Sequence, residues 1–308
     1  MGFRSVFWKT LTDLTGWKTL LLFAIPLVTL MAVLPTYFMF RTEYQTHQAA
    51  IHNATNQFLA VSFLWISGFF LAFLVVANAA GFVAKEESDG TLLLLSSKPV
   101  SRRQIVLGKL AALVIRTVLL EAVLLTLVAV LFRFALGLEE DALVALLKAI
   151  PWIVLYSVLV IAFFGAISLA LSVLTKNLVA IMVIMSCLVM FSFLLGPLIR
   201  QMMPNAGNSY IEYHVYYVDP SYHLQNSFVF FQEHASGGSL APQYARWFGS
   251  AGIVATPNEA GDLGSSYLWY TVGPVGHVSP VGSAVVLLAV ALGATSLAMW
   301  AMQRKEIH

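Results

Sequence analysis

Long runs of apolar residues constrain this chain more than any other feature. Six of them are long enough to cross the hydrocarbon core of a bilayer, for which an α-helix needs about 20 residues. Only 10% of the 308 residues are charged, against about 25% in an average soluble domain. The sequence therefore predicts an all-α membrane protein with six transmembrane helices. We place these helices at 19–40, 58–84, 105–136, 149–174, 178–200 and 280–302.

The positions of the basic residues indicate how the spans are oriented. Six spans put both termini on one side, and cytoplasmic segments of membrane proteins carry an excess of Lys and Arg. With both termini inside, the inner segments hold Arg4, Lys9, Lys18, Lys85, Lys98, Arg102, Arg103, Lys109, Lys176, Arg304 and Lys305, and the outer segments hold Arg41, Arg133, Lys148, Arg200 and Arg246. We therefore expect a multi-pass protein of the cell membrane with cytoplasmic termini.

Regions outside the spans differ in composition. Phe3, Phe7, Leu11 and Leu14 share one face of the N-terminal segment, which predicts an amphipathic helix lying at the membrane interface. The last outer segment is rich in Tyr, Ser, Gly, Pro and His, and a loop of this length is expected to fold into a small extracytoplasmic cap. In sequence order we expect the interfacial helix at 1–18, five spans with a cytoplasmic loop (85–104) at 19–200, the outer insertion at 201–279, and the sixth span with a cytoplasmic tail at 280–308.

Two patterns are visible inside the outer insertion. Residues 210–218 alternate loosely, as a strand does, whereas 220–234 have the pattern of an amphipathic helix. The insertion is the region in which we expect a substrate or an extracytoplasmic partner protein to bind.

The cytoplasmic loop at 85–104 concentrates charges in a chain where charge is scarce. Its pattern predicts a short helix, a turn and then a new helix capped by Ser101. The apolar run Leu92–Leu95 would face the cytosol, and an apolar helical face exposed there requires a partner to cover it.

Residues of this loop and of the start of the helix after it resemble the signature of type-2 permease subunits of ATP-binding-cassette (ABC) transporters. The six-span layout is similar along the whole chain, and the permeases of copper-enzyme maturation systems are the most similar in character. Lys98 departs from the family pattern, in which an uncharged residue precedes the proline. The residues that carry the resemblance are Glu86, Gly90-Thr91-Leu92, Leu94-Leu95, Pro99, Ser101-Arg102, Ile105 and Gly108-Lys109.

The resemblance implies that the loop forms a coupling helix in a groove of a separate cytosolic ATPase. It also implies a dimer of permeases, most simply a homodimer, that couples ATP hydrolysis to export or to mechanical work. ATP and Mg would be bound by the ATPase, and this chain would bind no cofactor and would not be an enzyme by itself. The implied coupling residues are Glu86, Gly90, Thr91, Leu92, Leu94, Leu95, Pro99, Ser101 and Arg102.

Two charged residues lie within the third predicted span. Arg116 and Glu121 are five residues apart, about 140° around a helix, so they do not form the favoured i,i+4 pair. An isolated charge in hydrocarbon is costly. Each residue therefore needs a partner elsewhere, either as an interhelical hydrogen bond or as a polar contact along a transport path.

Two other functional classes remain open. A proton-coupled secondary transporter would use Glu121, and a membrane enzyme would use outer-side histidines. His214, His223 and His234 are the weak candidates for a metal site, because imidazole binds zinc and copper but their spacing does not suggest convergence. The net charge of +2 gives no indication of a nucleic-acid partner.

Overall fold

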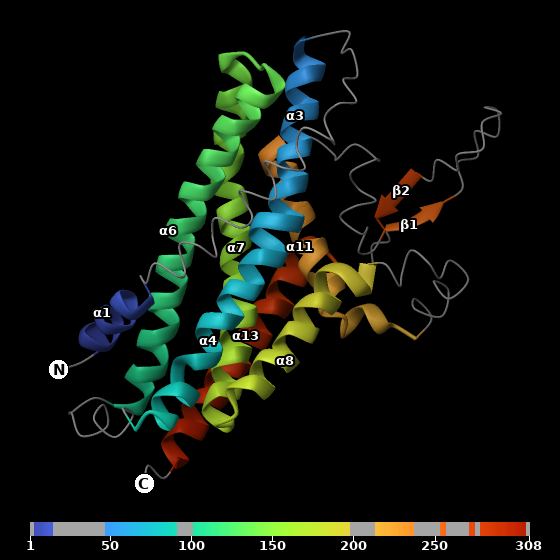
Figure 1. Ribbon diagram of the computed structural model, residues 1–308. Helices are drawn as coiled ribbons and strands as arrows, with labels where there is room; N and C mark the ends of the chain where they lie inside the picture. The colour runs from blue at the N-terminus through green and yellow to red at the C-terminus, as the bar shows by residue number, and fades with distance from the viewer. Residues whose placement is uncertain are drawn as a thin grey trace.

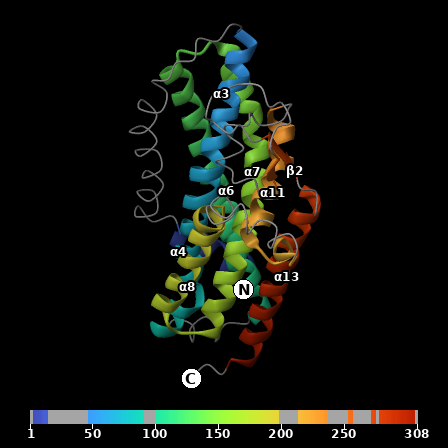
Figure 2. The same ribbon diagram turned by 90° about the vertical axis from the view of Figure 1, so that its right-hand side faces the viewer.

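A bundle of long helices forms the protein (Figures 1 and 2). The computed structural model describes residues 3–14, 47–90, 101–197, 213–236, 253–256, 271–274 and 278–305. Within these ranges five helices are long and apolar enough to cross a membrane: Ala54–Ser88, Arg102–Phe134, Glu140–Leu174, Leu178–Leu195 and Pro280–Arg304. They correspond to the second to sixth predicted spans, and the first, 19–40, lies outside the described residues. The prediction of a multi-pass membrane protein is confirmed.

The described elements follow one another in chain order, with two π-helical segments inside the spans. They are α1 (Phe3–Leu14), α3 (His47–Val61), the π segment η1 (Ser62–Phe70), α4 (Leu71–Ser88), α6 (Arg102–Leu136), α7 (Glu140–Leu174), α8 (Leu178–Met190), the π segment η2 (Phe191–Leu195), the 3₁₀ turn η3 (Val215–Tyr217), α11 (Pro220–Ser236), β1 (Ile253–Thr256), β2 (Thr271–Pro274) and α13 (Pro280–Arg304). At 1.5 Å per residue, the 35-residue helices α6 and α7 are each about 52 Å long, more than the hydrocarbon core requires.

Small polar residues and glycine determine where the helices begin and end. Ser101 and Gln104 form a capping box at the start of α6: the Ser101 hydroxyl accepts from the Gln104 amide at 3.3 Å, and the Ser101 amide donates to Oε1 of Gln104 at 3.2 Å. Gly137, with φ of +63°, ends α6 in the left-handed conformation that favours glycine. The cap predicted at Ser101 is confirmed.

The outer insertion is only partly helical. Residues 220–234, predicted as a helix, lie within α11, which packs against α7 and α13 (Figure 1). The described part of 210–218 forms turns and the 3₁₀ segment instead of the strand that its alternation suggested. A two-stranded antiparallel sheet, in which Ile253 pairs with Pro274 and Thr256 with Thr271, is the exception to the helical architecture among the described residues.

An aromatic cluster joins the π segments to α7 and α11. The ring of Phe63 lies 4.4 Å from that of Phe228, 5.6 Å from that of Tyr156 and 6.1 Å from that of Phe193, between centroids. Gly68 of η1 allows the close approach of η2, because a Cβ there would lie 2.8 Å from the Phe193 ring. The outer insertion thus shares one hydrophobic core with the spans.

Helix α1 lies beside the first turns of α6 (Figure 1), and its packing face differs from the predicted apolar face. Val6, Thr10 and Leu14 are buried, whereas Phe3 is 41% exposed. Gly108 makes this contact possible, because a Cβ at this position would lie 3.2 Å from Cγ1 of Val6. The exposed aromatic side of α1 remains available for the membrane interface.

Gly108→Val is expected to displace α1 from α6 and to lower the stability by about 1–3 kcal/mol, the usual cost of overpacking. Faster hydrogen exchange of residues 3–14 and a lower melting temperature in detergent would report this. Gly293→Ala is the control, because nothing lies within 4 Å of a Cβ at that position of α13. Unchanged exchange of α1 in Gly108→Val would contradict the proposed role of Gly108.

Candidate functional site

The described structure contains both ends of the predicted coupling loop. Glu86 lies in the last turn of α4 and Gly90 in the turn that follows this helix. At the other end of the loop, Ser101 caps α6 and Arg102 is its first residue. Gly90 has φ of +69°, a conformation that favours glycine. The remaining implied coupling residues, Thr91, Leu92, Leu94, Leu95 and Pro99, lie outside the described residues.

Glu86 forms an ion pair with a buried lysine. The Nζ atom of Lys109 lies 2.7 Å from Oε2 of Glu86 and donates to the carbonyl oxygen of Phe82 at 2.6 Å. The side chain of Lys109 is only 4% exposed, and Lys9 of α1 approaches the same carboxylate at 3.6 Å. Glu86, which the resemblance assigns to ATPase coupling, thus ties α4 to α1 and α6.

Glu87 forms a second set of ion pairs at the same end of the bundle. Its carboxylate lies 2.5 Å from Nζ of Lys305, at the end of α13, and 3.0 Å from Nζ of Lys176, in the turn between α7 and α8. Lys305 also donates to the carbonyl oxygen of Val173 at 2.8 Å. Four helices therefore meet at one carboxylate.

Arg102 binds the C-terminal end of α13. Its guanidinium donates to the carbonyl oxygens of Met302 at 2.7 Å, Gln303 at 3.3 Å and Lys305. The last carbonyls of a helix have no partner within the helix and carry its negative dipole end, so a cation here is favourable. The neighbouring Arg103 is exposed, with no hydrogen bond or ion pair to the described part of the chain.

Together these side chains form what we call the loop-end cluster. In Figure 1 the ends of α4 and α13 and the start of α6 lie at the same end of the bundle, and α1 lies beside α6. The cluster connects both ends of the loop at 85–104 to neighbouring helices. A force on that loop therefore acts on several helices. Its members are Lys9, Glu86, Glu87, Arg102, Lys109, Lys176 and Lys305.

Sequence reasoning missed the ion pairs of Glu87 and Lys305, and it counted Lys109 among the inner basic residues and in the family motif but not as the partner of Glu86. The available signal was weak: charged residues at the ends of several spans, which the positive-inside rule already explains. The pairing depends on which helix ends are adjacent, and hydropathy does not report that adjacency.

The two intramembrane charges have different surroundings. Glu121 is completely buried, and its carboxyl contacts the hydroxyl of Ser157 on α7. That hydroxyl has one hydrogen but also lies 2.9 Å from the carbonyl oxygen of Ile153. The hydroxyl of Ser157 is thus shared between these two acceptors, and its contact with Glu121 links α6 to α7 inside the bundle. The expected interhelical partner of Glu121 is thus Ser157.

Arg116, also buried, makes no hydrogen bond through its guanidinium within the described ranges. The predicted partner of Arg116 is therefore not found among these residues, and Arg116 and Glu121 remain separate features of α6.

The three candidate histidines do not converge. His214 contacts the hydroxyl of Tyr216 at 2.9 Å, and His234 lies 2.7 Å from the carbonyl oxygen of Phe230. His223 is buried between Ser283 and the carbonyl oxygen of Tyr217, at 3.1 and 2.9 Å. Each ring is used in a local or interhelical contact, and the three do not form a shared site.

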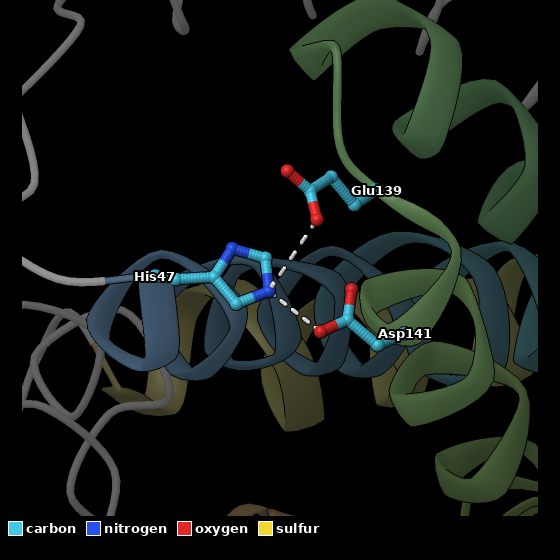
Figure 3. Close-up of side chains that lie close together, drawn as sticks. All are labelled: His47, Glu139 and Asp141. Carbon is cyan, nitrogen blue, oxygen red and sulfur yellow. Dashed lines mark hydrogen bonds and ion pairs between the residues drawn. The ribbon is translucent and has the colours of Figure 1, made fainter.

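A different histidine lies close to two carboxylates (Figure 3). Nε2 of His47, at the start of α3, is 2.5 Å from Oδ2 of Asp141 and 3.9 Å from Oε2 of Glu139, both near the start of α7. The three side chains are exposed and offer one nitrogen and two oxygen ligands of the kind that zinc uses. The hydrogen bond with Asp141, and the charge of that carboxylate, raise the pKa of His47 above its ordinary value of 6.5.

Removing one member of the buried pair is expected to destabilise the protein strongly. Lys109→Met should leave Glu86 without its closest cation, and Glu86→Gln should leave Lys109 without its carboxylate, each costing roughly 3–5 kcal/mol. The double variant should recover much of the loss, because no unpaired buried charge remains. Thermal unfolding in detergent measures this, and additive losses in the double variant would contradict the pairing.

The His47–Asp141 contact predicts pH-dependent stability. Because the folded state raises the pKa of His47, its contribution is complete below about pH 6.5 and is lost as the pH rises through the raised pKa. The difference in melting temperature between the wild type and His47→Gln should thus be larger at pH 6 than at pH 9. His52→Gln is the control, because His52 is an exposed histidine of the same helix. If the melting temperature depends on pH in the same way in His47→Gln and in the wild type, the prediction is contradicted.

Comparison with known families supplies the remaining evidence. Residues 4–306 match a family model described as ABC-2 family transporter protein. The match reaches from the first turn of α1 to the end of α13 and includes all members of the loop-end cluster. No match is found among individually curated proteins.

Proposed function

The chain belongs to the ABC-2 family of transporter proteins, and from this premise we propose that it is a permease subunit driven through the loop at 85–104. A separate cytosolic ATPase, which binds ATP and Mg, docks on that loop and moves it. The chain itself is the non-catalytic membrane subunit, and it has no Gly-x-x-x-x-Gly-Lys-Ser/Thr loop with which to bind nucleotide phosphates.

The loop-end cluster is the observation that carries this proposal. A loop that only sets membrane topology has no need to be fixed at both ends. Here Glu86 and Glu87, near the start of the loop, and Arg102, near its end, contact α1, α6, α13 and the turn after α7. Ion pairs that exclude water are stronger than exposed ones, so displacement of the loop is passed to these helices.

The orientation follows from the same cluster. Docking on a cytosolic ATPase requires the cluster to be cytoplasmic, which agrees with the excess of Lys and Arg in those segments. Both termini are then cytoplasmic, and His47, Asp141 and α11 lie toward the outside.

Assembly with a second copy completes the proposed complex. Only 28% of the residues in the apolar windows of α8 and α13 are buried. Their exposed apolar side chains contact lipid and, over part of their surface, the second permease. The outer insertion, 201–279, is the proposed site for a substrate or an extracytoplasmic partner protein.

Proton-coupled transport by Glu121 is less well supported. A carboxyl group that carries protons across the membrane must be reached by water from one side at a time. Glu121 has no exposed surface and is held by Ser157 on the neighbouring helix. These contacts favour a structural hydrogen bond between α6 and α7.

Purification from native membranes in mild detergent tests the proposed function. The tagged chain is expected to retain a stoichiometric cytosolic ATPase, identified by mass spectrometry. Replacement of Leu92 and Leu93 by Asp should abolish its retention, because the apolar face of the loop is lost. Glu139→Ala and Glu140→Ala, exposed positions at the other end of the bundle, are the matched controls. Absence of any ATPase with the intact chain would refute the proposal.

A further inference from the structure

We propose that α13 transmits movement of the cytoplasmic loop to the outer insertion, and that Arg102 is the positioning residue that joins the loop to this helix. The inference rests on the proposed function, because it names the route by which work done on the loop reaches the opposite side of the membrane. It requires a firm contact at each end of α13 and a continuous helix between them.

The cytoplasmic end of α13 is fixed by two cations. Arg102, the first residue of α6, donates to the carbonyl oxygens of Met302 and Gln303 in the last turn of α13 and to that of Lys305, which follows the helix. Lys305 in turn binds Glu87, one residue before the end of α4. Both ends of the loop are thus connected to α13.

The outer end of α13 is fixed by a buried polar network. The hydroxyl of Ser283 lies 3.1 Å from Nδ1 of His223 and accepts from the amide of Asn226 at 2.8 Å. Asn226 also donates to the carbonyl oxygen of Val278, at 2.9 Å, just before α13. Ser283 has no exposed surface, and His223 is 2% exposed.

Hydrogen bonding in this network assigns the histidine tautomer. Nε2 of His223 faces the carbonyl oxygen of Tyr217 at 2.9 Å, so Nε2 carries a hydrogen and donates it. With the hydrogen of the ring on Nε2, Nδ1 accepts from the hydroxyl of Ser283. Each hydrogen bond of the network then has a defined donor and acceptor, so the network holds α11 in one orientation on α13.

Between these ends α13 is a continuous helix of 25 residues, about 38 Å long. Its proline, Pro280, is at the first position, where it does not interrupt the helix. Figures 1 and 2 both show α13 running from the cytoplasmic end of the bundle to the region of α11. One face of α13 is buried along the whole helix, where it packs against α7, α11 and α6, and the opposite face is exposed. Because it is continuous and is also joined by polar contacts at both ends, α13 can shift as one unit against these neighbours.

Arg102 and Arg103 provide a matched pair for the test. They are adjacent and carry the same charge, but only Arg102 bonds to α13 within the described structure. Hydrogen exchange measured by mass spectrometry on the full chain in nanodiscs follows α11 and the start of α13 in separate peptides. The first measurement uses the chain alone and therefore does not depend on the ATPase.

Arg102→Ala is expected to raise exchange in 278–284 and 220–236 by roughly threefold or more, in the range of mutations that alter coupling between sites. Arg103→Ala should leave both peptides unchanged, and Arg102→Lys should recover part of the protection, because an ammonium also donates to helix carbonyls. Equal effects of Arg102→Ala and Arg103→Ala, or no effect of either on α11, would overturn the inference.

The second measurement adds the co-purifying ATPase with ATP. In the wild type we expect altered exchange both at 101–110 and at 220–236. In Arg102→Ala, and equally in Ser283→Ala, the response at 101–110 should persist while that at 220–236 is lost. Ser283→Ala keeps the test decisive if Arg102→Ala does not fold. A full response at 220–236 in the folded variants would refute the inference, whereas failure of the wild type to bind any ATPase would refute the proposed function instead.

Discussion

The pairing of charges that are removed from water at one end of an apolar bundle is the constraint on which this structure depends. Lys109 lies in the apolar stretch of α6 between Gln104 and Arg116, and its buried ammonium is accommodated because Glu86 and the Phe82 carbonyl meet it. That requirement places the end of α4 against the start of α6. The loop between them is thereby held at a defined place at the bundle's end.

Similar polar contacts join other helix ends of the bundle. Glu87 needs cations, and Lys176 and Lys305 supply them from helix ends that are distant in sequence. Arg102 supplies donors to the carbonyls at the end of α13. Apolar side chains fill most of the space between the two ends of the bundle, where Glu121 with Ser157 is a polar exception. The ion pairs of the loop and the network around Ser283 lie near the two ends. Such an arrangement suits a subunit whose helices must move together rather than unfold.

Hydropathy and capping residues were sufficient to predict much of the fold. Five of the six predicted spans coincide with described helices because a helix in hydrocarbon must satisfy its own backbone, so length and composition decide the matter. Ser101 was predictable as a cap because its contact with Gln104 is local. The strand expected within 210–218 was wrong because loose alternation over a few residues carries little information, and packing of Tyr216 against Tyr222 prevails there.

The sequence by itself determined that this chain crosses the membrane several times, where its helices begin, and which loop carries the features of a coupling element. All of these depend on local properties: hydrophobicity, caps and a short motif. Only the tertiary structure decided that Glu86 holds Lys109, that Arg102 binds Met302, and that His47 meets Asp141. The last two contacts join residues 200 and 94 positions apart. Helix packing brings them together, and no local pattern records which helix ends become neighbours.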